Sequence, residues 1–147
     1  MKNLLVTFAV VLATGVAPVL ADGKDTDPKT EAVFARQFAG AENVRWTVVD
    51  SDHKKVTFTL GGTRAEAYFN DEGELLGTIR NIFYSKLPLL VMQSINSRYA
   101  DPVIIEVKEI TNNDGTSYRV VFEQKNKKYS LKLNSMGDVT STDKIRK

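Results

Sequence analysis

The sequence contains no cysteine and a single histidine, His53. Disulfide bonds, thiolate nucleophiles and cysteine-ligated metal centres are therefore excluded, and a domain of this length has to rely on its hydrophobic core. A serine–histidine–aspartate triad would need His53 beside a nucleophile, and no G-x-S-x-G segment is present. His53 lies in the predicted loop DSDHKK, where solvated surface is the simpler interpretation and a metal site with Asp50 and Asp52 is the alternative.

The chain also has little charge of one sign. Twenty Lys and Arg residues oppose 18 Asp and Glu residues, which gives a net charge of +2. The basic residues are scattered, so the sequence lacks the electrostatic footprint of a nucleic-acid-binding protein. Most acidic residues fall in predicted turns or at outward strand positions, not in a cleft where paired carboxylates could act as acid and base. We predict a protein that is not an enzyme, uses no cofactor or metal and binds no nucleic acid.

The longest apolar stretch, Leu4–Ala13, is too short to span a bilayer. Lys2 precedes this stretch, a Gly and a Pro follow it, and small residues at Val19 and Ala21 suit a signal-peptidase site. We predict a signal peptide over residues 1–21, a mature chain of residues 22–147 without a transmembrane segment, and a periplasmic or secreted location. An N-terminal membrane anchor that is kept is the alternative.

The rest of the sequence predicts two helices and about eight strands. Asp27 and Pro28 suit the start of a first helix that ends at Ala39-Gly40, and Pro88 marks the start of a second helix. The other segments alternate apolar and polar residues with period two, which is typical of strands with one covered face. These segments are VRWTVV, KVTFTL, TRAEAYF, LLGTIRNIFY, VIIEV, SYRVVF, YSLKLN and a short strand near Val139.

The two halves of the mature chain repeat the same pattern. Matched positions are Phe34 and Ile95 at an offset of 61, Val56 and Tyr118 at 62, and Phe69 and Leu133 at 64. The offset grows only where a loop lies between the matched blocks, which is where insertions are tolerated. We predict a single α+β domain with tandem repeats at about 28–84 and 85–145. The repeats form one roughly eight-stranded curved antiparallel sheet with two helices on one face.

The run NDEGE at residues 70–74 offers several oxygen atoms, so a calcium loop is one interpretation. The same place in the second repeat reads NSMGD at residues 134–138, with Ser and Met in place of the middle acids. A hairpin turn with a left-handed glycine explains both copies, whereas a metal explains one. We predict a turn in each repeat.

The face of the sheet that no helix covers is the remaining candidate for function. By alternation it displays Thr47, Val49, Thr57, Thr59, Arg64, Glu66, Tyr68, Arg119, Val121, Ser130 and Lys132. This mixture of Arg, Tyr and small polar residues is typical of protein-binding surfaces, and an ordinary solvated face is the alternative. We predict Arg64, Tyr68, Arg119 and Lys132 as the partner-binding residues.

Several segments resemble the beta-lactamase-inhibitor-like, PepSY-like family of secreted bacterial proteins. The resemblance rests on AVFARQFAGAENVRW, AEAYFNDEGELLGT, Leu87-Pro88, Tyr118 and LNSMG, and it covers about residues 30–142. It implies tandem helix-plus-sheet repeats that form one curved sheet whose concave face can bind a partner. The beta-lactamase inhibitors of this fold carry a disulfide in each repeat, and this sequence departs from them because it has no cysteine.

Together these observations predict a protein-binding module of the cell envelope, an inhibitor or regulator of an envelope enzyme that acts through its open sheet face. The partner would be an envelope or secreted protein. The alternative is a carrier for a small apolar or anionic ligand held between the helices and the sheet.

Overall fold

The computed structural model describes residues 26–145, so the predicted signal peptide lies outside the described residues. The elements are α1 (Pro28–Gln37), β1 (Glu42–Val48), β2 (His53–Leu60), β3 (Thr63–Asn70), β4 (Leu75–Asn81), the 3₁₀ helix η1 (Tyr84–Lys86), α2 (Leu89–Arg98), β5 (Val103–Asn112), β6 (Gly115–Gln124), β7 (Lys127–Asn134) and β8 (Val139–Ile145). The strands pair in chain order in one eight-stranded antiparallel sheet. The predicted α+β class is confirmed. Neither α1 nor α2 is long and apolar enough to cross a membrane.

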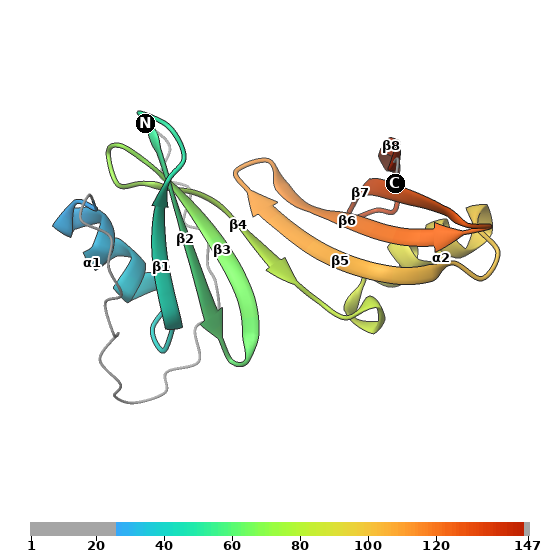
Figure 1. Cartoon of the computed structure of the whole chain (residues 1–147), viewed down its shortest axis with the longest axis horizontal. Coiled ribbons are helices and arrows are strands. Elements are labelled where there is room, and N and C mark those ends of the chain that lie inside the picture. The colour runs from blue at the N-terminus through green and yellow to red at the C-terminus, as the bar shows by residue number, and fades with distance from the viewer. Residues whose placement is uncertain (1–25, 146–147) are drawn as a thin grey trace. The chain divides into compact units, whose positions relative to one another are not determined.

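The chain divides into two compact units between Thr78 and Ile79. We call residues 26–78 unit 1 and residues 79–145 unit 2. Unit 1 holds α1 and β1–β3, and unit 2 holds η1, α2 and β5–β8, while the boundary falls within β4 (Figure 1). Each unit buries its own hydrophobic core.

In unit 1 the core forms where α1 meets the inward side chains of β1–β3. Asp27 takes the N-cap position in an extended conformation and Pro28 opens the helix, as predicted, although the Asp27 side chain makes no capping hydrogen bond. Phe34 of α1 contacts Phe58 of β2 edge to face, with ring centroids 5.1 Å apart. The residues of this core with no exposed surface are Val56, Ala67 and Phe69. Gly40, with φ +83°, lies between the end of α1 and the start of β1, where the chain changes direction.

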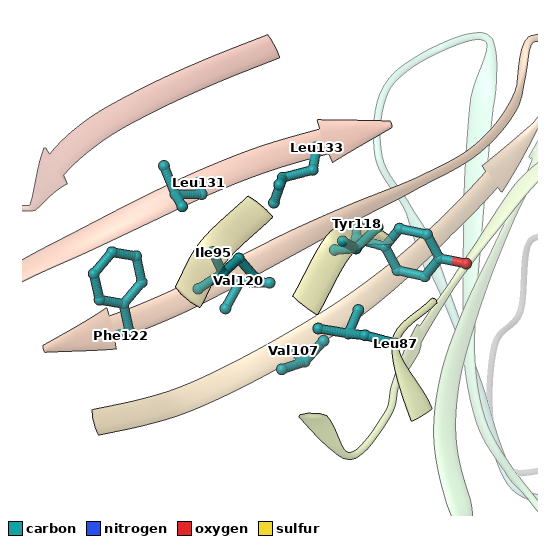
Figure 2. Packing of buried hydrophobic residues seen from close by; sticks show 9 residues of the cluster. Leu87, Ile95, Val107, Tyr118, Val120, Phe122, Leu131 and Leu133 are labelled. Atoms are coloured by element: carbon teal, nitrogen blue, oxygen red, sulfur yellow. The ribbon is translucent and has the colours of Figure 1, made fainter. Parts of the chain in front are cut away.

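Unit 2 repeats this arrangement with α2 over β5–β8. Pro88 takes the N-cap position of α2, and Ile95 in the second turn has no exposed surface. Figure 2 shows the cluster of side chains that α2 and the preceding Leu87 share with the strands. The strand residues of the cluster are Val107, Tyr118, Val120, Phe122, Leu131 and Leu133.

In unit 1, two apolar residues that the alternation of VRWTVV and KVTFTL places on the covered face lie outside the core. Val48 at the end of β1 is 55 % exposed and Leu60 at the end of β2 is 38 % exposed. A ten-residue helix such as α1 is about 15 Å long, whereas strands of seven or eight residues extend for about 23–27 Å. The strand ends therefore project beyond the helix that covers their middles.

The register of the strands corrects one of the repeat offsets. The β2–β3 hairpin turns at Gly61-Gly62 and the β6–β7 hairpin at Lys125-Asn126, all four with positive φ and 64 positions apart. Val56 therefore corresponds to Val120, not to Tyr118. A slip of two residues leaves every side chain on the same face, so the alternation alone could not detect it. The pairings Trp46 with Val56 and Val107 with Val120 keep the predicted offset of 61 for β1 and β5.

The predicted turns at residues 70–74 and 134–138 are confirmed and make the same hydrogen bonds. In the first turn the Asn70 side chain accepts from the Glu74 N–H (2.8 Å) and donates to the Glu74 carboxylate (3.0 Å). The Gly73 N–H donates to the Asn70 carbonyl oxygen (3.1 Å). The turn at 134–138 repeats these three bonds at 2.9, 2.9 and 3.1 Å. The asparagine is thus a turn residue in both copies.

The glycine of each turn packs against the first turn of the helix in its own unit. A Cβ atom on Gly73 would lie 2.9 Å from Thr30 Oγ1, and a Cβ atom on Gly137 would lie 2.5 Å from the Leu90 carbonyl oxygen. Both glycines also have positive φ, at +79° and +88°. The first turn of each helix therefore packs directly against a hairpin turn. Only glycine permits this distance, because any Cβ atom at that position would clash with the helix.

We expect Gly137→Ala to destabilise the protein more than Gly61→Ala. Gly61 has φ +56° and open space around it, so alanine there costs only the left-handed conformation, about 1–2 kcal/mol. At Gly137 the same cost adds to the clash with Leu90. Urea unfolding of both variants measures the difference, and equal losses would show that the contact with α2 is loose.

Thr30 carries a buried hydroxyl without a partner. Its side chain has no exposed surface, and Oγ1 makes no hydrogen bond within residues 26–145. The corresponding residue of unit 2 is Val91, which is also completely buried. Unit 2 therefore places an apolar residue of similar shape where unit 1 buries an unsatisfied polar group.

We expect Thr30→Val to raise the free energy of unfolding by about 1 kcal/mol or more, because it removes an unsatisfied buried hydroxyl. Thermal or urea unfolding measures the gain. Val91→Thr, the reverse exchange at the corresponding site, serves as the control and should be destabilising. A loss of stability in Thr30→Val would mean that the hydroxyl has a partner in solution.

Candidate functional site

On the side of each unit away from its helix, outward side chains align in rows across neighbouring strands. In unit 1, Thr47 of β1 pairs with Lys55 of β2, and Lys55 pairs with Tyr68 of β3. These three residues alternate with core residues such as Val56, so they stand on the face that α1 does not cover. We call the helix-free side of each unit its open face.

Tyr68 is fixed on the open face of unit 1 by Glu66, which lies two residues earlier on the same strand. The Tyr68 hydroxyl donates to Glu66 Oε2 at 3.0 Å. Partial burial, then this hydrogen bond and the Glu66 charge, raise the pKa of Tyr68 above its ordinary value. Tyr68 therefore stays neutral and keeps its polar end anchored while the ring remains accessible.

The corresponding row of unit 2 is cationic. Lys108 of β5 pairs with Arg119 of β6, and Arg119 pairs with Lys132 of β7. Arg119 Nε donates to Ser130 Oγ at 3.0 Å, and Lys108 lies 3.4 Å from Glu106 Oε1. Within residues 26–145, Arg119 and Lys132 make no ion pair.

The structure places the four predicted partner-binding residues in two pairs, one in each unit. Arg64 and Tyr68 lie on the outward side of β3, four residues apart with Glu66 between them. Arg119 and Lys132 are direct neighbours across β6 and β7. All four side chains reach the open faces, and Arg64, Arg119 and Lys132 are exposed.

The prediction missed Lys55 and Lys108, which complete the two rows. Alternation already placed Lys55 outward, but it gives no information about which residue of a neighbouring strand lies opposite. That pairing depends on the hairpin lengths. The registers of β1–β2 and β5–β6 supply it.

Two residues predicted to be displayed on the open face are buried. Val121 is 5 % exposed and Ser130 is 6 % exposed. Both lie in the row next to the cationic one, where Arg119 reaches Ser130. The long side chain of Arg119 thus reaches over Ser130 from the neighbouring row, an effect that the alternation of the sequence does not include.

His53 is exposed, as predicted, but it opens β2 and is not in a loop. Its Nδ1 lies 2.8 Å from Asp50 Oδ1, and the Asp52 N–H donates to the same oxygen at 2.9 Å. The Asp52 N–H and then the His53 side chain hold the pKa of Asp50 below its ordinary value. The Asp50 carboxylate is thus already engaged by the Asp52 N–H and by the His53 ring within the same turn.

A cavity of about 570 Å³ lies at one end of unit 2, beside the β6–β7 hairpin. Polar and apolar surface contribute about equally to its lining, which includes the charged residues Arg98, Asp101, Glu123 and Lys125. The carrier alternative, for a small apolar or anionic ligand, instead requires a chamber between helix and sheet. At that place Val91 and Ile95 of α2 meet strand residues that have no exposed surface.

Comparison with known proteins identifies the fold. No protein-family model and no curated protein sequence matches the chain. Among solved structures, a BLIP-like protein from Bacteroides fragilis has a TM-score of 0.71 and 18 % identity over 82 % of this chain and 87 % of its own. A candidate periplasmic protein from Bacteroides eggerthii has a TM-score of 0.75 and 14 % identity over 82 % and 90 % of the two chains. A DUF2874 family protein from Bacteroides ovatus has a TM-score of 0.71 and 22 % identity over 82 % and 89 %.

The predicted resemblance to beta-lactamase-inhibitor-like proteins is therefore confirmed as a likeness of fold. None of these structures bears on the PepSY-like part of the prediction. At these identities the likeness concerns the fold and not the side chains of the open faces.

We expect Glu66→Gln to lower the pKa of Tyr68 towards its ordinary value of 10.0 but not to reach it. Glutamine removes the charge and can still accept the hydrogen bond, whereas burial, the largest cause, is unchanged. NMR titration of the tyrosine rings measures this. Tyr84, whose pKa is raised by burial alone, is the internal control and should not move.

The sign of the linked stability follows from the raised pKa. The contribution of Tyr68 to stability is complete below its unfolded pKa and is lost as the pH rises through the folded pKa. In Glu66→Gln the folded pKa is lower, so this alkaline loss should be smaller and complete at a lower pH. A Tyr68 titration identical to that of the unmodified protein would contradict the contact with Glu66.

Proposed function

We propose that the protein is a non-enzymatic binding module of the periplasm or the extracellular space. It recognises another envelope or secreted protein through the open faces of its sheet, as an inhibitor or regulator of an envelope enzyme. The location rests on the leader-like residues 1–21, and the fold it shares with a candidate periplasmic protein is in keeping with it.

The observation that carries the proposal is the state of the long side chains on the open faces. Arg64, Arg119 and Lys132 are exposed, and the last two have no ion-pair partner in the part of the chain that the structure describes. Arg and Tyr are enriched among residues that dominate protein interfaces, and Tyr68 supplies an anchored ring beside them.

The rigidity of the faces supports the same proposal. The strands that carry these residues are interior strands of the sheet, each hydrogen-bonded to a neighbour on both sides, and their opposite faces are buried in the two cores. A partner would therefore meet a preformed surface, and little conformational freedom would be lost on binding.

We expect the mature chain, residues 22–147, to capture an envelope protein in a cross-linking pull-down from envelope extract of the source organism, and Arg64→Glu/Arg119→Glu to lose it. Reversal of one charge in each unit introduces repulsion where the partner would dock. Quantitative mass spectrometry of the captured proteins compares the two baits.

The matched control is Lys29→Glu/Lys86→Glu, which reverses one exposed charge in each unit on helical segments. It changes the net charge by the same amount and leaves the open faces unaltered. A partner retained by this control and lost by the open-face variant supports the proposal. Equal capture by all three baits would exclude the open faces as the binding surface.

A further inference from the structure

The cationic row of unit 2 places three like charges side by side. Lys108, Arg119 and Lys132 occupy directly opposed positions on three neighbouring strands. Adjacent strands lie about 4.8 Å apart, and like charges directly opposite one another in a sheet are destabilising. The row therefore carries an electrostatic cost in the free protein that a negative partner would relieve.

Neighbouring residues neutralise the positive charge of the row only at its Lys108 end. Lys108 has Glu106 within 3.4 Å on its own strand. Arg119 is held at Nε by the buried hydroxyl of Ser130, an uncharged acceptor, so its guanidinium is positioned without being neutralised. Lys132 makes no ion pair among the described residues. The unbalanced positive charge thus lies at Arg119 and Lys132.

Unit 1 shows that the fold does not need this row. The corresponding positions are Thr47, Lys55 and Tyr68, which form the same strand pairings with a single cation. Because both units bury equivalent cores, the extra cations of unit 2 have no structural purpose that unit 1 lacks. Their arrangement points to a ligand.

We propose that Arg119 and Lys132, supported by Lys108, bind an acidic segment of the partner protein. This inference rests on the proposed function and names the chemistry of the partner. A guanidinium fixed at Nε still offers its two terminal nitrogens to a carboxylate, and Lys132 beside it provides a second cation within reach of a neighbouring acid. The segment would carry at least two carboxylates on one face.

The charges around the row favour a short acidic segment over a continuous phosphate backbone. Glu106 and Asp143 occupy the two ends of the next row, in line with Val121 and Ser130. Each would repel a polyanion that extended past the cationic row, whereas two local carboxylates would not meet them. The net charge of the whole chain, +2, adds no general attraction for nucleic acid.

The test is fluorescence anisotropy of a labelled, extended peptide with alternating glutamates, mixed with the mature chain. We expect saturable binding that weakens as salt is added and that a peptide with Gln in place of Glu does not show. Arg119→Gln/Lys132→Gln should weaken binding at least about tenfold, since both unbalanced cations are removed. Lys86→Gln/Lys127→Gln, which removes two exposed cations outside the row, is the matched control and should bind as the unmodified protein does.

Three results would overturn the proposal. One is the absence of binding at millimolar peptide, a second is equal weakening in the two variants, and a third is tighter binding of duplex DNA than of the acidic peptide. The control variant should keep the unfolding midpoint of the unmodified protein, and Arg119→Gln/Lys132→Gln should keep or raise it because two opposed like charges are removed. A loss of binding can then not be ascribed to unfolding.

Competition separates this inference from the proposed function. If the pull-down captures a partner that Arg64→Glu/Arg119→Glu loses and the acidic peptide displaces, both hold. A partner that depends on the open faces but is not displaced by the acidic peptide would leave the proposed function intact. It would refute the inference that the partner binds through an acidic segment. Capture that is independent of the open faces would remove the proposed function itself.

Discussion

The burial of one sheet face beneath a ten-residue helix is the constraint on which both units depend. Each helix presents a narrow apolar stripe, so only the middle of each strand is covered, and the ends at Val48 and Leu60 remain in solvent. The same burial leaves the opposite face of every strand free. Outward side chains can therefore diverge between the units, while the inward ones are held to the shapes of Phe, Val, Leu and Ala.

The sequence predicted this one-sided architecture because period-two alternation and helix-start signals are local properties. Asp27, Pro28 and Pro88 stand at helix starts, and each alternating segment contains a strand. The predicted strand LLGTIRNIFY ends early, at Asn81, and its last residue, Tyr84, begins η1. Register is different, because it depends on how many residues each hairpin contains. Val56 was therefore matched with Tyr118 instead of Val120, and the alignment of Lys108 with Arg119 was not foreseen.

The candidate site was predictable only to the level of a face. Arg64, Tyr68, Arg119 and Lys132 do point outward, as the alternation requires. Burial on that face also depends on contacts between strands, such as the one in which Arg119 reaches Ser130. No local pattern contains that information, since the covering residue lies on another strand.

The β5–β6 hairpin differs from its counterpart in unit 1 by three residues, the whole difference between the offsets of 61 and 64. Its tip, Asn112–Gly115, is exposed, and the Asn112 side chain accepts from the Asp114 N–H at 3.0 Å. The strands on both sides keep their pairing whichever hairpin length joins them. This tip is therefore a natural point of attachment, where a fluorophore, an affinity tag or a small inserted domain can be joined to the molecule without touching a core.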